Sequence, residues 1–283
     1  MAKYSLVIHP QTQVELERLL ASKPHAVILE APEGSGKRSV SEWLAAELAE
    51  VSDPHKALQQ VLFIDRGEDK TVKIEKIRSI EQFLMRKLPG DATRVVIVDD
   101  AHTMASEAQN ALLKTLEEPP ANTSIILLAN TVSALLPTVR SRSITITIKH
   151  PTPTELKAYF TTQGFAATDV DRAILMSGGL PGLMHAILTS DADHPMMTAA
   201  ATARQIIQET RFGRLTLVDV LAKQREQAIA VCQMLQRMAH LRLQSDPLAA
   251  QWQHILKSSY DAEEQLMASG QPKLVLTSLM LNL

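Results

Sequence analysis

A glycine-rich loop ending in a lysine follows a short apolar run near the start of the chain. Residues 31–38 read Ala-Pro-Glu-Gly-Ser-Gly-Lys-Arg, which matches the phosphate-binding motif G-x-x-x-x-G-K-[ST] at Gly36 and Lys37 but at neither end. In that motif, backbone N–H groups and the lysine surround nucleotide phosphates at a helix N-terminus, and the final hydroxyl holds magnesium. Ala31 replaces the first glycine, and Arg38 stands where the magnesium ligand belongs. The residues predict a nucleotide-binding loop without its metal ligand.

In such a loop Lys37 would contact the β- and γ-phosphates. The backbone N–H groups around the phosphates would belong to Gly34, Ser35, Gly36 and Lys37. Ser39 does not replace the missing hydroxyl, because one step along a helix turns a side chain by about 100°. The alternative is a glycine-rich turn that only links a strand to a helix. Since Mg²⁺ tolerates little distortion of its octahedral ligand set, we expect binding of ATP and Mg²⁺ to be weakened.

Two carboxylates, Asp99 and Asp100, end the apolar run 95–98, where an ATPase would carry its Walker B pair. Asp99 would then hold Mg²⁺ through its water shell. The second residue of such a pair is normally a glutamate that orients the attacking water, and Asp100 is one methylene shorter. The alternative is a pair of exposed carboxylates at the end of a strand. Together with Arg38, the pair predicts impaired hydrolysis.

Two further polar residues have two interpretations each. Asn130 follows the apolar run 124–129, where it could sense a γ-phosphate beside the carboxylates, or could simply form a turn. Arg142 lies on a later loop, where an exposed arginine is usually a solvated charge. At an oligomer seam it could instead reach a neighbour's γ-phosphate as an arginine finger. Spacing alone leaves both alternatives open.

The elements that position these residues alternate between strand and helix over residues 1–149. Strands are predicted at 26–29, 61–64, 94–100, 124–129 and 144–148. Helices are predicted over 40–49, over a segment from Ile74 to Leu88 that Pro89-Gly90 ends, and around Ala108, Leu112 and Leu116 before Pro119-Pro120. This alternation predicts an open parallel α/β sheet.

From residue 150 on, the pattern is helical only. A small helical unit is expected at 150–192, a polar linker at Asp191–Pro195, and a second helical domain at 193–283. Five apolar residues there are candidates for core packing or for packing between subunits, namely Met234, Met238, Leu266, Leu274 and Leu279.

The composition describes an ordinary globular protein, with 45% hydrophobic and 21% charged residues. The net charge of −2 lacks the basic excess of a protein that coats DNA alone. Cys232 is the single cysteine, so an internal disulfide and a four-thiolate zinc site are excluded. The sequence shows neither a signal peptide nor an apolar stretch that would span a bilayer. We therefore expect a cytoplasmic protein without membrane contact.

Three segments together resemble the AAA+ clamp-loader family. They are Gln-Asn-Ala-Leu-Leu-Lys-Thr-Leu-Glu-Glu-Pro-Pro at 109–120, the strand that leads to Asn130, and Leu-Pro-Thr-Val-Arg-Ser-Arg-Ser at 136–143. The resemblance is dense over residues 20–190 and thin beyond. It implies a P-loop AAA+ sheet domain, a helical lid and a helical collar that closes a five-subunit ring. It also implies that Arg142 is the family's arginine finger in trans, with Ser143 replacing the cysteine of its Ser-Arg-Cys signature.

Departures from the family pattern indicate a particular member. Motor subunits keep the loop hydroxyl and a lid arginine, whereas this chain has Arg38 and no basic residue at 179–184. They often keep a four-cysteine zinc module, and no cysteine occurs at 50–63. The first two losses imply a largely non-hydrolysing stator of the DNA polymerase III holoenzyme. Such a subunit lends Arg142 to a neighbouring ATPase subunit while a sliding clamp is loaded.

The resemblance also implies partners. These are the motor subunits (gamma and tau) and the delta subunit of a hetero-oligomer, the sliding clamp, and primed DNA reached through the assembled complex. Two other functions remain open. One is an active motor-type clamp-loader ATPase that uses Lys37, Asp99 and Asp100 despite Arg38. The other is an AAA+ regulator outside replication, which should form a homo-hexamer.

Overall fold

The computed structural model describes residues 6–51, 59–67, 69–86, 92–191, 194 and 196–283. The chain divides into two compact units, Met1–His150 and Pro151–Leu283. The predicted division of the second unit into lid and collar stays a prediction. The linker expected at Asp191–Pro195 lies mostly outside the described residues. The helix predicted from Ile74 to Leu88 ends earlier, at Leu84, so its predicted end was wrong; Leu88 and Pro89-Gly90 themselves lie outside the described residues.

The first unit is built on a sheet of five parallel strands in the order β2-β3-β4-β1-β5, which confirms the predicted fold class. The strands are β1 (Ala26–Glu30), β2 (Val61–Ile64), β3 (Arg94–Val98), β4 (Thr123–Ala129) and β5 (Ile144–Thr147). In the centre, Leu29 of β1 lies opposite Leu128 of β4 and Ile146 of β5. Because all strands run the same way, the carboxyl ends of β1, β3 and β4 meet at one edge.

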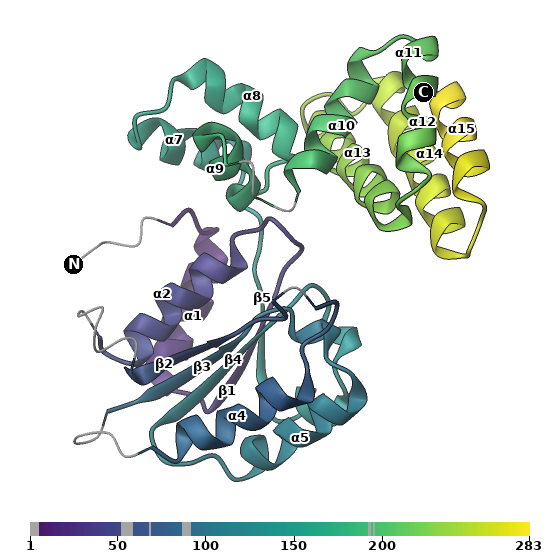
Figure 1. The fold of residues 1–283 in the computed structure, drawn as a ribbon. Helices are drawn as coiled ribbons and strands as arrows, with labels where there is room; N and C mark the ends of the chain where they lie inside the picture. Colours follow the sequence, from purple (N-terminus) through teal and green to yellow (C-terminus); the bar gives the residue numbers. More distant parts are fainter. Residues whose placement is uncertain (1–5, 52–58, 68, 87–91, 192–193, 195) are drawn as a thin grey trace. The chain divides into compact units, whose positions relative to one another are not determined.

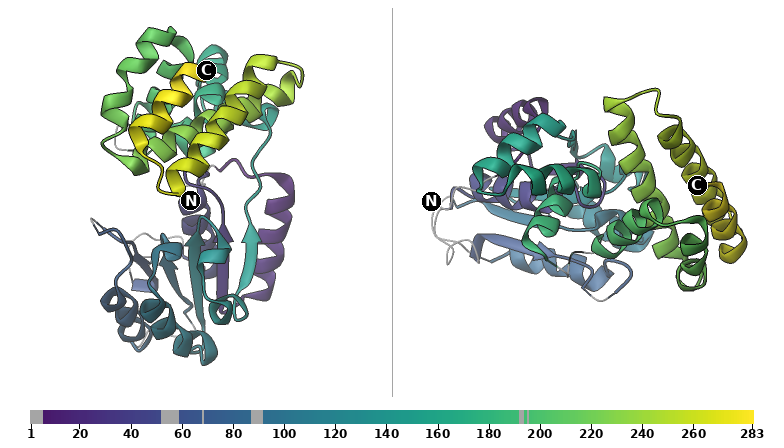
Figure 2. Two further views of the ribbon diagram at one scale, coloured as in Figure 1. Left: turned by 90° about the vertical axis from the view of Figure 1, so that its right-hand side faces the viewer. Right: turned by 90° about the horizontal axis from the view of Figure 1, so that it is seen from above.

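Helices cover both faces of this sheet (Figures 1 and 2). On one face lie α1 (Pro10–Ser22) and α2 (Lys37–Leu48), and on the other α4 (Ile74–Leu84), α5 (Ser106–Glu117) and the short α6 (Pro137–Arg140). The 3-10 turns η1 (Ala101–Thr103) and η2 (Val132–Ala134) follow β3 and β4. Successive strand residues point to opposite faces, so Ile97 packs with the α2 layer and Val98 with the α4–α5 layer. Each layer therefore has its own apolar core, and α1 is a helix that the sequence analysis did not predict.

In the part of the second unit that the structure describes, every element is a helix. Its first helices are α7 (Pro153–Thr162), α8 (Ala167–Ser177), α9 (Pro181–Thr189), α10 (Met197–Gln208), α11 (Arg211–Thr216) and α12 (Val218–Leu221). Three more follow, α13 (Arg225–Ser245), α14 (Ala250–Met267) and α15 (Pro272–Asn282), of which α13 and α14 are the longest of this unit. A capping box between Thr152 and Glu155 begins α7. Gly178 ends α8 with φ of +62°, and a Cβ there would lie 2.6 Å from Arg237 Cβ, so glycine is needed.

The apolar residues singled out for packing divide between two environments. Met234, Met238, Leu266 and Leu279 are buried in the core of the second unit, whereas Leu274 is 66% exposed on α15. Core packing therefore accounts for four of the five. Within the described ranges, no helix is both long and apolar enough to cross a bilayer.

Candidate functional site

The loop between β1 and α2 has the backbone of a phosphate cradle. Gly34 and Gly36 adopt the left-handed region, with φ of +76° and +83°, which a side chain would disfavour. Gly36 caps the start of α2, so the first N–H groups of that helix face the loop. The loop begins where Ala31 N–H donates to the Ala129 carbonyl over 3.1 Å, despite the loss of the first glycine. The buried Ser35 hydroxyl has no hydrogen-bond partner, so a polar group is left for an anion's oxygen. The phosphate part of the site fits.

Lys37 and Asn130 are brought together, 93 positions apart in the sequence. Lys37 is only 7% exposed, and its Nζ donates to Asn130 Oδ1 over 2.6 Å. Asn130 stands directly after β4, and its Nδ2 lies 3.1 Å from His102 Nε2 in η1. Burial lowers the pKa of His102 and favours its neutral ring. The sequence analysis missed His102, whose only signal was its place three residues after Asp99.

Asp99 directly follows β3, beside the same cradle. Its Oδ1 accepts the Asp100 backbone N–H over 2.9 Å. Burial, followed by the neighbouring Asp100 carboxylate, raises the pKa of Asp99, although Lys37 and Arg38 act in the opposite direction. The charges of Lys37 and Arg38 thus both favour the ionised form of this carboxylate. Asp99, Lys37 and Asn130 form one polar cluster at the carboxyl edge of the sheet.

Asp100 forms an ion pair with Arg66. Its Oδ2 lies 3.0 Å from the Nε of Arg66, which follows β2. Its backbone is left-handed, with φ of +50°, and its carbonyl accepts from Thr103 N–H over 2.8 Å. The ion pair engages the carboxylate for which the sequence analysis predicts a water-orienting position. The sequence analysis did not single out Arg66, because its approach to Asp100 depends on β2 and β3 being neighbours that end at the same edge of the sheet.

Arg38 is held by two contacts outside the loop. Its Nε lies 3.2 Å from Glu42 Oε1, one helical turn along α2, and its guanidinium lies 4.3 Å from the centre of the Phe63 ring of β2. Ser39 is exposed on α2. Because neither residue supplies a hydroxyl next to Lys37, the magnesium part of the site does not fit. Among the described residues, no three His, Cys, Asp or Glu side chains gather as metal ligands.

Arg142 lies apart from this cluster, two residues beyond α6. Its Nη1 donates to the Thr138 carbonyl over 3.1 Å, and its Nη2 lies 2.8 Å from Glu117 Oε1 at the end of α5. The side chain is 36% exposed. A guanidinium held in this way at the surface can present its remaining N–H groups to an anion outside the chain.

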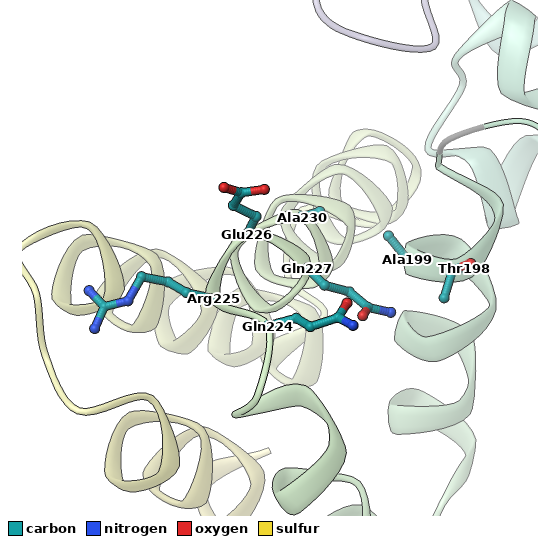
Figure 3. A pocket seen from close by; sticks show the side chains of 7 residues that line it. All are labelled: Thr198, Ala199, Gln224, Arg225, Glu226, Gln227 and Ala230. Atoms are coloured by element: carbon teal, nitrogen blue, oxygen red, sulfur yellow. The ribbon is translucent and has the colours of Figure 1, made fainter. Parts of the chain in front are cut away.

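A pocket of about 660 Å³ lies in the second unit, between α10 and the start of α13. Its lining comprises Thr198, Ala199, Gln224, Arg225, Glu226, Gln227 and Ala230 (Figure 3). Arg225 extends away from the other labelled side chains and donates to the carbonyls of Leu266 and Gly270 over 2.8 and 2.9 Å. The one cation of the lining is thus used to tie α13 to the end of α14, and the pocket lacks the features of the phosphate cradle.

Comparisons with known proteins identify the family that the chain resembles. The family model for "DNA polymerase III, delta subunit" matches residues 8–152, slightly more than half of the chain. DNA polymerase III subunit delta' of Pseudomonas aeruginosa is 32% identical over 140 residues, which are 44% of this chain and 43% of that protein. DNA polymerase III subunit gamma of Buchnera aphidicola subsp. Schizaphis graminum is 29% identical over 42% of this chain and 37% of that protein. The chain thus spans about two fifths of the length of these relatives.

A solved structure extends the likeness of the fold over both units. It is a DNA polymerase III gamma subunit-related protein from Thermotoga maritima, with a TM-score of 0.59 and 21% identity, covering 95% of this chain and 97% of that one. The resemblance to AAA+ clamp-loader subunits is thereby confirmed at the level of family and fold. The chain belongs to the DNA polymerase III delta subunit family.

Proposed function

We propose that this chain is a clamp-loader subunit that hydrolyses ATP weakly or not at all and supplies Arg142 to a neighbouring ATPase subunit. In this proposal its partners are the gamma or tau motor subunits and the delta subunit. The assembly loads a sliding clamp onto primed DNA. This assignment is supported by the chain's membership of the family and by its similarity to relatives named delta' and gamma.

Three contacts support weak hydrolysis by the chain itself. Asp100, at the water-orienting position, is paired with Arg66. Arg38 replaces the magnesium-holding hydroxyl and packs on Phe63. Lys37 already donates to Asn130. Nucleotide phosphates could still enter the cradle, because Gly34, Ser35 and Gly36 keep its backbone and its open hydroxyl.

The observation that carries the proposal is the contrast between the chain's own candidate nucleotide site and Arg142. The groups that would act on the chain's own nucleotide are occupied or replaced, whereas Arg142 is intact and partly exposed. A positioned guanidinium stabilises the charge that develops on a transferring phosphoryl group, which accelerates the reaction by about 10³ to 10⁵. This electrostatic task does not require the donor subunit to turn over ATP.

The test compares reconstituted complexes with the motor and delta subunits. We expect Arg142→Ala to lower DNA-stimulated hydrolysis at the adjacent site by about 10³-fold, so the total rate falls by that site's share. Arg140→Ala is the matched control, because Arg140 is an exposed arginine two residues away. An unchanged rate in the Arg142→Ala complex would remove the proposed finger.

An active motor-type subunit is the second candidate, favoured by the clustering of Lys37, Asp99 and Asn130 and by the gamma relatives. It predicts ATP hydrolysis by the isolated chain that Lys37→Ala abolishes. A regulator outside replication predicts stable homo-hexamers, which a mass measurement would detect.

A further inference from the structure

We propose that Glu117 is a positioning residue for Arg142: its carboxylate fixes the guanidinium in the orientation in which it is offered to the neighbouring subunit. This inference rests on the proposed function of Arg142. It assigns a task to a glutamate that the sequence analysis treated only as part of a family motif.

The contacts of Arg142 fix the plane of its guanidinium. Glu117 Oε1 holds Nη2 at 2.8 Å. On the other side, Nη1 donates to the Thr138 carbonyl at 3.1 Å and lies 3.4 Å from Ser141 Oγ. Thr138 and Ser141 belong to the same short segment as Arg142, whereas Glu117 belongs to a different helix. Glu117 is therefore the partner that relates the guanidinium to the rest of the sheet domain.

The anchor itself is rigid, because α5 is tied to the segment that carries Arg142. Gln109 of α5 is 3% exposed; its Nε2 donates to the Met104 and Ala134 carbonyls, and its Oε1 accepts the Leu136 N–H over 2.7 Å. Leu116 of α5 and Val139 of α6 share the apolar core on this face. The carboxylate thus stands on a fixed helix, opposite a fixed turn.

The exposure of Arg142 and Glu117 sets how much the loss of their ion pair should lower the rate. The two side chains are 36% and 49% exposed, and an ion pair of this kind shifts an equilibrium by up to about fivefold. Loss of the pair should leave the chain folded, yet let a side chain with four torsions sample other orientations. Only part of the population would then present the guanidinium correctly, so the rate supported by Arg142 should fall by the same factor.

The experiment measures DNA-stimulated ATP hydrolysis in complexes reconstituted from the full chain and its motor and delta partners. The Arg142-dependent rate is the rate with wild-type protein minus the rate with Arg142→Ala. We expect Glu117→Gln to lower it about two- to fivefold. Glu118→Gln is the matched control, since Glu118 is the next residue, is exposed and has the same charge; it should leave the rate unchanged. Glu117→Asp should recover part of the loss.

Three outcomes would overturn the inference. A Glu117→Gln rate equal to wild type, or above it, would mean that the pair does not orient the finger. A loss that persists when Glu117→Gln is added to Arg142→Ala would place its effect elsewhere, because a positioning residue acts only through Arg142. If Arg142→Ala itself leaves the rate of ATP hydrolysis unchanged, the proposed function of Arg142 is wrong, and the role of Glu117 that rests on it is wrong as well. Melting temperatures of all variants check that each one is folded.

Discussion

Arg38→Thr restores the hydroxyl that a phosphate-binding loop uses to hold magnesium, and it tests whether this one residue weakens the metal site. The matched control is Arg38→Val, which removes the same contacts and has nearly the shape of threonine but no hydroxyl. Both variants lose the packing of the guanidinium on Phe63 and the ion pair with Glu42. Any difference in measured properties between the two variants is therefore due to the threonine hydroxyl.

The structure gives the size of both effects. Loss of an exposed cation–π contact costs about 0.5–1 kcal/mol, and loss of the ion pair about 0.3–0.5 kcal/mol. Both variants should therefore melt a few degrees lower, at roughly 2–4 °C per kcal/mol for a unit of this size. A new ligand to the cation should be worth at least as much as a hydrogen bond to a charged group, about 1.5–3 kcal/mol. That corresponds to about 10- to 150-fold in affinity.

Calorimetric titration of each variant with ATP, with and without Mg²⁺, measures this difference. We expect Arg38→Thr to gain at least about tenfold in magnesium-dependent affinity over Arg38→Val. Hydrolysis should stay slow in both, because Asp100 remains paired with Arg66. Equal affinities in the two variants would refute the reasoning, and would mean that something other than the missing hydroxyl limits the metal site.

Two further predictions concern the stability of each unit. Burial raises the pKa of Asp99 in the folded chain, so folding favours the protonated carboxyl over the carboxylate. The ionised Asp99 therefore lowers the free energy of unfolding at pH values above the folded pKa. This cost shrinks as the pH falls toward the unfolded pKa of about 3.9. Asp99→Asn should melt higher than wild type at pH 7, with a smaller difference in acid, and equal melting temperatures at pH 7 would contradict this cost. In the second unit, burial raises the pKa of Cys232 to about 12, so a thiol reagent at pH 8 should modify it only as fast as the unit opens. Labelling that is complete in native buffer before any denaturant is added would contradict its burial.

The sequence predicted the parallel sheet well because its signals are local. β1 to β4 are short apolar runs ended by a polar or glycine-rich segment, and β5 alternates Ile with Thr; both patterns leave few alternatives to a strand. The strand predicted at 61–64 matches β2 residue for residue. By contrast, α1 carries only a few buried residues, among them Leu16 and Leu19, and its weak apolar periodicity gave no clear prediction.

The partners of the site residues were not predictable in the same way. That Asp99 and Asn130 share an edge follows from parallel strands, so their clustering with Lys37 could be expected. The ion pairs of Asp100 with Arg66 and of Arg142 with Glu117 depend on side-chain rotamers and on the order of strands in the sheet. Periodicity contains no information on either. The direction of Arg38 likewise depends on Phe63, a residue 25 positions away on an adjacent element.

The contacts of Lys37 explain how the loop between β1 and α2 keeps its shape without depending on turnover. A buried ammonium is costly unless polar groups surround it, and in this chain Asn130 Oδ1 stands 2.6 Å from its Nζ. That contact joins the start of α2 to the end of β4, and Asn130 in turn approaches His102 in η1. The lysine thus links three elements of the sheet edge with groups that the chain itself supplies. Its presence in the sequence is therefore accounted for by structure as well as by nucleotide binding, and retention of Gly36 and Lys37 does not require that this subunit hydrolyse ATP.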